Sequence, residues 1–295
     1  NNLGFFKKVR ITNEPGSSPD RVVVTVDVED QATGSFAVSG GYSTGDGLIA
    51  ELSVQESNFM GRGQFVRAAV SAGQHSRGVE FSFTEPYFMD RRIAAGFDLF
   101  NKQNDDSRYS RYESWVTGGT VRFGIPITDQ FTFSPRYSIY QSRIKIPNSK
   151  DKPYDDCFYP IPGVTPGTPG APAVDATNNC LYNGEALLAV KEARGTRLVS
   201  MPGYSLTYST IDNMKNPTSG FYLDFKQDIA GLGGDAKFLR TTGEARVYRE
   251  LFDDVVGFVK LQAGHIQGFG GQKLRINDHF NLGPSLVRGF APGGL

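Results

Sequence analysis

The stretch Gly34-Ser-Phe-Ala-Val-Ser-Gly-Gly-Tyr42 alternates small or polar residues with larger apolar ones, and Leu48-Ile-Ala-Glu-Leu-Ser-Val-Gln55 continues the pattern. Successive side chains of a β-strand point to opposite faces, so this alternation predicts strands with one apolar face and one polar face. The same period of two extends along the chain, and it predicts a mostly β, antiparallel fold. We expect about eleven strands, at 36–42, 48–55, 66–72, 79–84, 93–99, 115–125, 131–143, 204–210, 221–229, 238–248 and 256–266.

The lengths of these runs and of their connections favour a transmembrane barrel over a soluble β-sandwich. Several runs reach the ~10 residues that a tilted strand needs to cross a bilayer, whereas strands of soluble sheets are usually ~5–6 residues long. Short turns on one side and long loops on the other are typical of outer-membrane barrels. The short turns are expected at 58–63, 86–91, 126–130 and 251–254, and the longer loops include 101–111 and 145–195.

Charged residues recur within the polar faces of the expected strands. A Lys or Arg facing lipid near the bilayer midplane costs roughly 2–4 kcal/mol, so we expect these side chains to face a hydrated lumen. The chain carries 31 basic and 31 acidic residues, a balance that does not support a nucleic-acid partner. The expected lumen charges are Glu51, Arg67, Glu80, Asp98, Arg122, Arg136, Asp224, Lys226, Arg240, Glu244, Arg246 and Lys260.

Residues 1–30 form a unit of their own. Two β-branched runs, Lys8–Thr12 and Arg21–Val28, flank a turn at Pro15–Pro19, and this pattern predicts a hairpin. The polar residues 27–33 are expected to be a short linker. The chain shows no signal peptide, begins within a fold and stops within a loop, so we expect it to be part of a longer protein.

The insertion at 145–195 is rich in Pro and Gly, and we expect no regular secondary structure over its length. It contains Cys157 and Cys180, for which a disulfide in an oxidising compartment is the favoured interpretation and two free thiols the alternative. No His or second Cys pair lies nearby, so neither cysteine is expected to bind zinc.

No arrangement typical of catalysis is evident. The histidines His75, His265 and His279 are scattered, and none sits in a recognisable Ser/His/acid pattern. We therefore expect no catalytic residue, no metal site and no cofactor, and we do not expect an enzyme.

The last stretch, 281–295, is too rich in Gly and Pro to be a strand. Within it, Val287-Arg288-Gly289-Phe290 places a cation and an aromatic ring around a glycine. Taken alone, this motif fits a surface loop with a solvated Arg. A charged loop that needs a partner inside a large β structure is the other interpretation.

Together, the ordered motifs resemble the Omp85 family of outer-membrane β-barrel assembly proteins. Each motif falls where the alternation places a strand or a turn. In this resemblance, residues 1–30 look like the C-terminal part of a periplasmic POTRA domain, and 31–295 like an incomplete barrel that ends inside the Val287–Phe290 loop. The motifs are Thr33–Phe36, Asn58–Gly63, Phe83–Phe88, Phe123–Ile127 and Val287–Phe290.

The resemblance implies a barrel of sixteen strands, of which about five, together with an acidic partner for Arg288, would lie outside this chain. It implies a location in the bacterial outer membrane with the N-terminal part in the periplasm. The implied partners are unfolded outer-membrane β-barrel clients, periplasmic chaperones, the lipoproteins of the β-barrel assembly machinery (BAM) and membrane lipid, with no nucleic acid.

The resemblance also implies a function, the folding and insertion of β-barrel proteins through a weak lateral seam at the first strand. Glycines there agree with a weak strand, although easier curvature at a barrel rim is another interpretation. An Omp85-type two-partner secretion transporter, which exports a polypeptide through its lumen, is the alternative function; a passive porin is a third. The expected seam residues are Gly34, Ser35, Phe36, Ala37, Val38, Ser39, Gly40 and Gly41.

Overall fold

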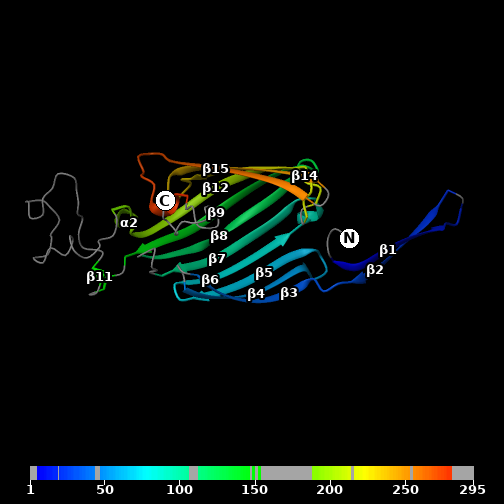
Figure 1. The fold of residues 1–295 in the computed structure, drawn as a ribbon, viewed down its shortest axis with the longest axis horizontal. Helices are drawn as coiled ribbons and strands as arrows, with labels where there is room; N and C mark the ends of the chain where they lie inside the picture. Colours follow the sequence, from blue (N-terminus) through cyan, green and yellow to red (C-terminus); the bar gives the residue numbers. More distant parts are fainter. Residues whose placement is uncertain are drawn as a thin grey trace, which may run out of the picture.

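The expected sheet of eleven antiparallel strands is confirmed in a computed structural model (Figure 1), with the order β15-β14-β13-β12-β9-β8-β7-β6-β5-β4-β3. The structure describes residues 5–18, 20–43, 47–105, 112–146, 148–149, 152–153, 188–213, 216–252 and 255–280. The strands are β3 Gly34–Ser43, β4 Gly47–Phe59, β5 Gln64–Gly73, β6 Ser76–Glu85, β7 Ala94–Asn104, β8 Glu113–Pro126, β9 Phe131–Lys145, β12 Gly195–Ser209, β13 Gly220–Ala230, β14 Phe238–Phe252 and β15 Val255–Gly268.

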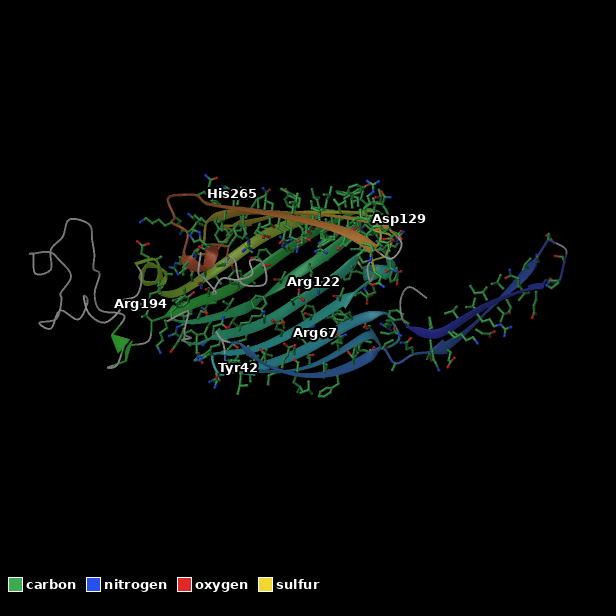
Figure 2. The ribbon with its side chains drawn as sticks, viewed as in Figure 1. Tyr42, Arg67, Arg122, Asp129, Arg194 and His265 are labelled. Carbon is green, nitrogen blue, oxygen red and sulfur yellow. The ribbon has the colours of Figure 1, made fainter. Side chains whose placement is uncertain are left out.

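The two faces of this sheet differ in the way that a membrane barrel requires. On β4, the apolar Leu48, Leu52 and Val54 are exposed, whereas Glu51 and Gln55 on the opposite face are partly covered. The same polarity runs round the curved wall, where Arg67 on β5 and Arg122 on β8 belong to the inner face (Figure 2). An apolar exterior around a polar interior is the reverse of a soluble sheet and matches a barrel with lipid outside and water inside. In the part of the chain that the structure describes, no helix is long and apolar enough to cross a membrane.

The connections follow the expected asymmetry only in part. Short turns do join β4 to β5, β8 to β9 and β14 to β15, and a short 3₁₀-helix, η1 (Phe88–Asp90), lies between β6 and β7. However, β5 and β6 on the long-loop side are joined by residues 74–75 alone, and residues 210–219 make a longer connection on the short-turn side. The backbone N–H of Gln74, at the start of the β5–β6 turn, donates to the carbonyl oxygen of Leu48 on β4 at 3.0 Å and so continues the pairing of β5 with β4.

The insertion after β9 contains more regular structure than expected. Helix α2 (Leu188–Ala193) precedes β12, and the two-residue strands β10 (Asn148–Ser149) and β11 (Lys152–Pro153) pair with each other. The helix forms because its sequence, Leu-Ala-Val-Lys-Glu-Ala, contains good helix formers and lies beyond the prolines of the insertion. Cys157 and Cys180 lie outside the described residues, so their disulfide stays a prediction.

The expected N-terminal hairpin is confirmed as β1 (Phe6–Pro15) paired with β2 (Val22–Asp30). It forms a separate two-stranded sheet that projects away from the barrel strands (Figure 1). Strand β2 continues to Asp30, so the linker to β3 is shorter than the sequence suggested. Large apolar side chains on both faces of the hairpin are exposed, among them Ile11, Val22, Val23, Val24 and Val26.

Candidate functional site

Strand β3 forms one edge of the described sheet. It pairs with β4 along its whole length, from Gly34 opposite Glu56 to Ser43 opposite Gly47. On its other side, no strand among the described residues pairs with it. An edge strand presents a row of unpaired backbone N–H and C=O groups, which is a template for another strand. The expected seam residues, 34–41, all lie on this edge.

The side chains of β3 divide sharply between its faces. Phe36, Val38 and Tyr42 point outward and are 64%, 71% and 72% exposed. The inner face carries only small groups: Ser35, Ala37, Ser39 and Gly41. This strand therefore offers apolar contact to the exterior and almost no side chain to the lumen.

Gly40 and Gly41 are not required by packing or by backbone conformation. A Cβ atom built on Gly41 meets nothing within 4 Å, and one on Gly40 has its nearest neighbour, the carbonyl oxygen of Ile49, at 3.9 Å. Neither glycine has a positive φ. Because a side chain would fit at both positions, the effect of these glycines is to leave the strand interior weak.

The beginning of β3, by contrast, is held firmly. The carboxylate of Glu56 accepts hydrogen bonds from the hydroxyl of Thr33 and from the backbone N–H of Asn58, the latter at 2.8 Å. A Cβ atom on Gly34 would lie 2.8 Å from Glu56 Oε2, at the far end of that side chain, and 3.9 Å from the next nearest atoms. The strand is thus anchored at one end and loosely built toward the other.

All twelve expected lumen charges take part in ion pairs. Arg122 donates two hydrogen bonds to Asp98, from Nε to Oδ2 at 2.8 Å and from NH2 to Oδ1 at 3.1 Å. It also donates from NH2 to Thr84 Oγ1 at 3.0 Å. These contacts tie β6, β7 and β8 together. The remaining pairs are Glu51–Arg67, Glu80–Lys102, Asp224–Lys226, Arg136–Asp228, Arg240–Asp228, Glu244–Arg246 and Glu244–Lys260.

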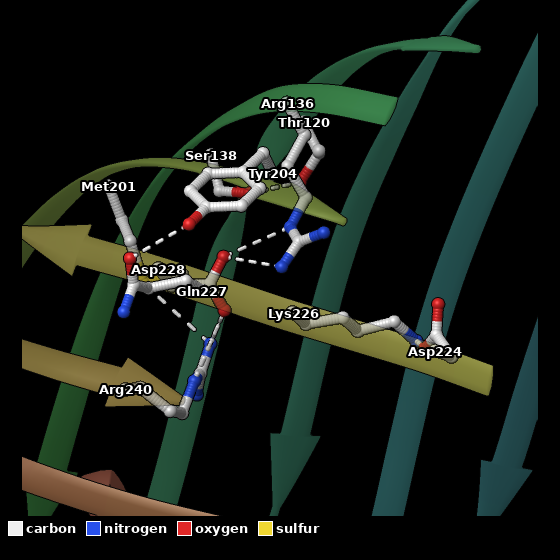
Figure 3. Close-up of polar contacts among 10 residues, drawn as sticks. All are labelled: Thr120, Arg136, Ser138, Met201, Tyr204, Asp224, Lys226, Gln227, Asp228 and Arg240. Atoms are coloured by element: carbon white, nitrogen blue, oxygen red, sulfur yellow. Dashed lines mark hydrogen bonds and ion pairs between the residues drawn. The ribbon is translucent and has the colours of Figure 1, made fainter. Parts of the chain in front are cut away.

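Asp228 on β13 is the centre of the most covered of these groups. Arg136 Nε and NH2 donate to its Oδ1 at 3.0 and 2.6 Å, and Arg240 NH2 donates to its Oδ2 at 3.2 Å (Figure 3). The contacts link β9, β13 and β14 across β12. Sequence reasoning missed Asp228, although it continues the spacing of two that Asp224 and Lys226 set on the inner face of β13.

The network of charges does not reach β3. Among the eleven strands of the described sheet, β3 alone carries no charged residue. Side-chain ties across the inner face therefore begin at β4, with Glu51 on β4 bonded to Arg67 on β5 at 3.2 Å. Strand β3 is joined to its neighbour by the backbone ladder and by the Thr33–Glu56 contact at its base.

The turn between β12 and β13 contains a tightly bonded carboxylate. Asp212 accepts hydrogen bonds from the hydroxyl of Thr218 and from the backbone N–H groups of Thr218 and Ser219, the latter two at 3.1 and 3.2 Å. These bonds, led by the Thr218 hydroxyl, hold the pKa of Asp212 well below its ordinary value. The charged form of Asp212 therefore orders this turn.

Some expected site residues cannot be located. Val287, Arg288, Gly289 and Phe290 lie outside the described residues. The three histidines belong to different parts of the fold: His75 to the β5–β6 turn, His265 to β15 (Figure 2) and His279 to the segment after β15.

Known proteins resemble this chain over its whole length. A family model described as the Omp85 superfamily domain matches residues 58–295. Outer membrane protein assembly factor BamA of Neorickettsia risticii is 28% identical over 297 residues, with 100% of this chain and 35% of the relative covered. The chain thus spans about a third of the length of this curated relative.

Two solved structures share the fold. The crystal structure of BamA from Haemophilus ducreyi lacking POTRA domains 1–3 aligns with a TM-score of 0.67 and 19% identity, covering 99% of this chain and 52% of the other. CdiB from Acinetobacter baumannii aligns with a TM-score of 0.55 and 13% identity, covering 98% of this chain and 49% of the other.

Proposed function

Because the chain belongs to the Omp85 superfamily, we propose that it is the barrel portion of an assembly factor that folds β-barrel proteins and inserts them into the bacterial outer membrane. The observation that carries this proposal is β3, a strand at one edge of the described sheet that carries no charge and has only small side chains on its inner face. Its proposed partners are unfolded β-barrel clients, periplasmic chaperones, accessory BAM lipoproteins and the surrounding lipid.

The proposed mechanism is strand addition at a lateral seam. A client strand aligns with β3 and takes up its free backbone hydrogen bonds, which gives affinity without demanding one client sequence. The outward Phe36, Val38 and Tyr42 keep this edge apolar where it meets lipid, while the small inner face avoids clashes with varied client side chains. The anchored base at Thr33 and Glu56 keeps the strand in register while its glycine-rich part yields.

Residues 1–30 are proposed to be the C-terminal part of a POTRA domain in the periplasm. An isolated two-stranded hairpin is marginally stable in water, and this one exposes valines on both faces. Both properties support a larger domain in which the hairpin is covered. The Val287–Phe290 motif is proposed to lie in the lumen, with Arg288 paired to a carboxylate, because the planar guanidinium suits bidentate binding.

A second candidate function is export of a polypeptide through the lumen. It is favoured by the likeness of the fold to CdiB, which extends over nearly the whole chain. The two functions differ in whether the seam at β3 must open.

A disulfide lock separates them. In the full-length protein with Cys157 and Cys180 replaced by Ser, one cysteine at Ser39 is bonded to another on the strand that closes against β3. The assembly function predicts that the lock stops client insertion into proteoliposomes and that reduction restores it. Export through the lumen would continue in the locked protein. Insertion at the unlocked rate with the lock in place would contradict the proposed seam.

A further inference from the structure

A cluster of buried apolar residues lies on the inner face of the N-terminal half of β12. Arg136 faces the lumen and pairs in register with Gly203, so Arg197, Val199 and Met201 lie on the same inner face of β12. Val199 and Met201 pack there with Ala230, Ala236 and Phe238, and Leu274 from the segment after β15 joins them. The end of that segment lies over the sheet on the side that carries α2 (Figure 1). The segment 269–280 therefore folds back into the mouth of the barrel.

A buried ion pair joins this segment to the wall. Arg197 NH1 donates to Asp278 Oδ2 at 2.6 Å, and each side chain is only 6% exposed. The same carboxylate oxygen accepts the backbone N–H of Arg275 at 2.8 Å, while the N–H of Asp278 donates to the Arg275 carbonyl at 2.9 Å. Asp278 thus closes the single turn η2 (Ile276–Asp278) and binds β12 at once.

An aromatic ring, a second cation and apolar side chains surround the pair. The Arg197 guanidinium lies 5.9 Å from the centre of the Phe238 ring, and Arg275 is a second cation close by. Ile276, next to Asp278, packs against Ile146 and Val190, the latter on α2. The segment is therefore held at one position between β12 and α2.

An ion pair is an unusual choice for this task if stability alone were needed. Apolar residues of similar volume commonly stabilise a buried site as well as or better than a charged pair. Unlike an apolar contact, however, a buried charge cannot slide past its partner, because any shift leaves an unpaired charge in a dry environment. The ion pair therefore serves to fix the position of segment 269–280 more than to stabilise the fold.

We propose that Arg197 and Asp278 are a positioning pair for barrel assembly: they hold 269–280 at one place in the barrel mouth and so set the point from which the chain continues beyond residue 280. The inference rests on the proposed assembly function. Lys273 and Glu192 offer a matched control, because they form an exposed pair at 3.7 Å between the same segment and α2, with 86% and 49% of their side chains exposed.

The test uses full-length protein with Cys157 and Cys180 replaced by Ser and a reporter cysteine at Ile276. Asp278→Asn removes the charge but keeps an oxygen that can accept the Arg275 N–H; Arg197→Gln removes the other charge. Three quantities are measured: the folded fraction from heat-modifiable gel mobility, the rate of maleimide labelling at position 276, and the rate of client insertion into proteoliposomes.

Each variant is expected to fold, to label at least about tenfold faster and to insert clients at least about tenfold more slowly, since a charge left unpaired in a dry site expels the segment. Lys273→Ala should match the reporter parent in all three quantities. Labelling at the parental rate would show that the pair does not hold the segment, and faster labelling with unchanged insertion would show that its position does not matter. Either result overturns the inference. If the parent itself inserts no client, the proposed function fails instead.

Discussion

At the scale of single residues, the charged side chains of the lumen differ in how much stability the folded protein would lose if each were removed. Arg136 and Arg240 both depend on Asp228, whose side chain is only 9% exposed. Glu51 and Arg67 form a pair at 3.2 Å but are 39% and 41% exposed. Removing one member of a covered group leaves charges without a partner and with little access to water, whereas exposed pairs contribute little.

Asp228→Ala is therefore expected to destabilise the folded protein by ~3–5 kcal/mol, because two guanidinium groups lose their shared carboxylate. Glu51→Gln should cost ~0–1 kcal/mol, since water replaces the lost partner of Arg67. Urea unfolding in lipid vesicles, followed by tryptophan fluorescence, compares the two variants. Equal losses would refute the distinction between the covered and the exposed pairs.

The β12–β13 turn should loosen in acid. The lowered pKa of Asp212 means that its charged form is favoured in the folded turn, so its contribution is present above the unfolded pKa of ~3.9 and declines as the pH falls through the lower folded value. Hydrogen exchange should therefore show the N–H groups of Thr218 and Ser219 protected at neutral pH and progressively less protected in acid. In Asp212→Asn this dependence should disappear. A variant that kept the wild-type acid profile would assign the effect to another group.

At the scale of elements, period-two alternation predicted the number of strands but not the whole of β12. The sequence indicates a strand at 204–210, and the structure extends it back to Gly195. Pro202 and Gly203 hid this half, because both residues normally interrupt a central strand. Here the ladder to β13 begins only at Gly203, and above it the backbone N–H of Leu198 donates to the carboxylate of Asp235 at 2.8 Å. The side chain of Asp235, in a loop, thus takes the place of a neighbouring strand as the hydrogen-bond partner of β12. An alternation of polar and apolar residues cannot reveal such a contact.

The same limit explains why the sequence did not predict the proposed positioning pair. Arg197 lies in the unpredicted half of β12, and Asp278 lies in a segment without periodicity. Their contact joins residues far apart in the chain, so only the fold brings them together. The strand at Gly34–Gly41, by contrast, was predictable because it follows a regular alternation, while its role as a seam stays a proposal.

Strengthening β3 should slow assembly without disturbing the fold. Gly41→Val adds a β-branched side chain where a Cβ meets nothing within 4 Å, so it should be accommodated and should stiffen the strand. Gly243→Ala on β14, also in open space, is the matched control at a strand far from the seam. We expect unchanged folding for both variants and slower client insertion for Gly41→Val alone. Equal insertion rates for Gly41→Val and Gly243→Ala would show that the glycines of β3 have no part in the mechanism.

At the scale of the whole molecule, the described part of the protein is a curved sheet whose outer face is apolar and whose inner face is cross-linked by charge. The charged ties link strands of the wall from β4 onward, some of them across an intervening strand, and leave β3 attached mainly through its backbone. A wall that is stiff over most of its length and weak at one strand suits a machine that must remain folded while one edge accepts a client. The proposed function depends on that contrast.

The most direct measurement of this claim is site-specific cross-linking to a stalled client during insertion. Single cysteines are placed at Ser35, Ala37 and Ser39 on β3, and at Thr117 and Val121 on β8 in the middle of the wall. Our account predicts disulfide cross-links from the β3 positions to the terminal strand of the client, with none from β8. Equal cross-linking from both strands, or none from β3 while insertion proceeds, would contradict it.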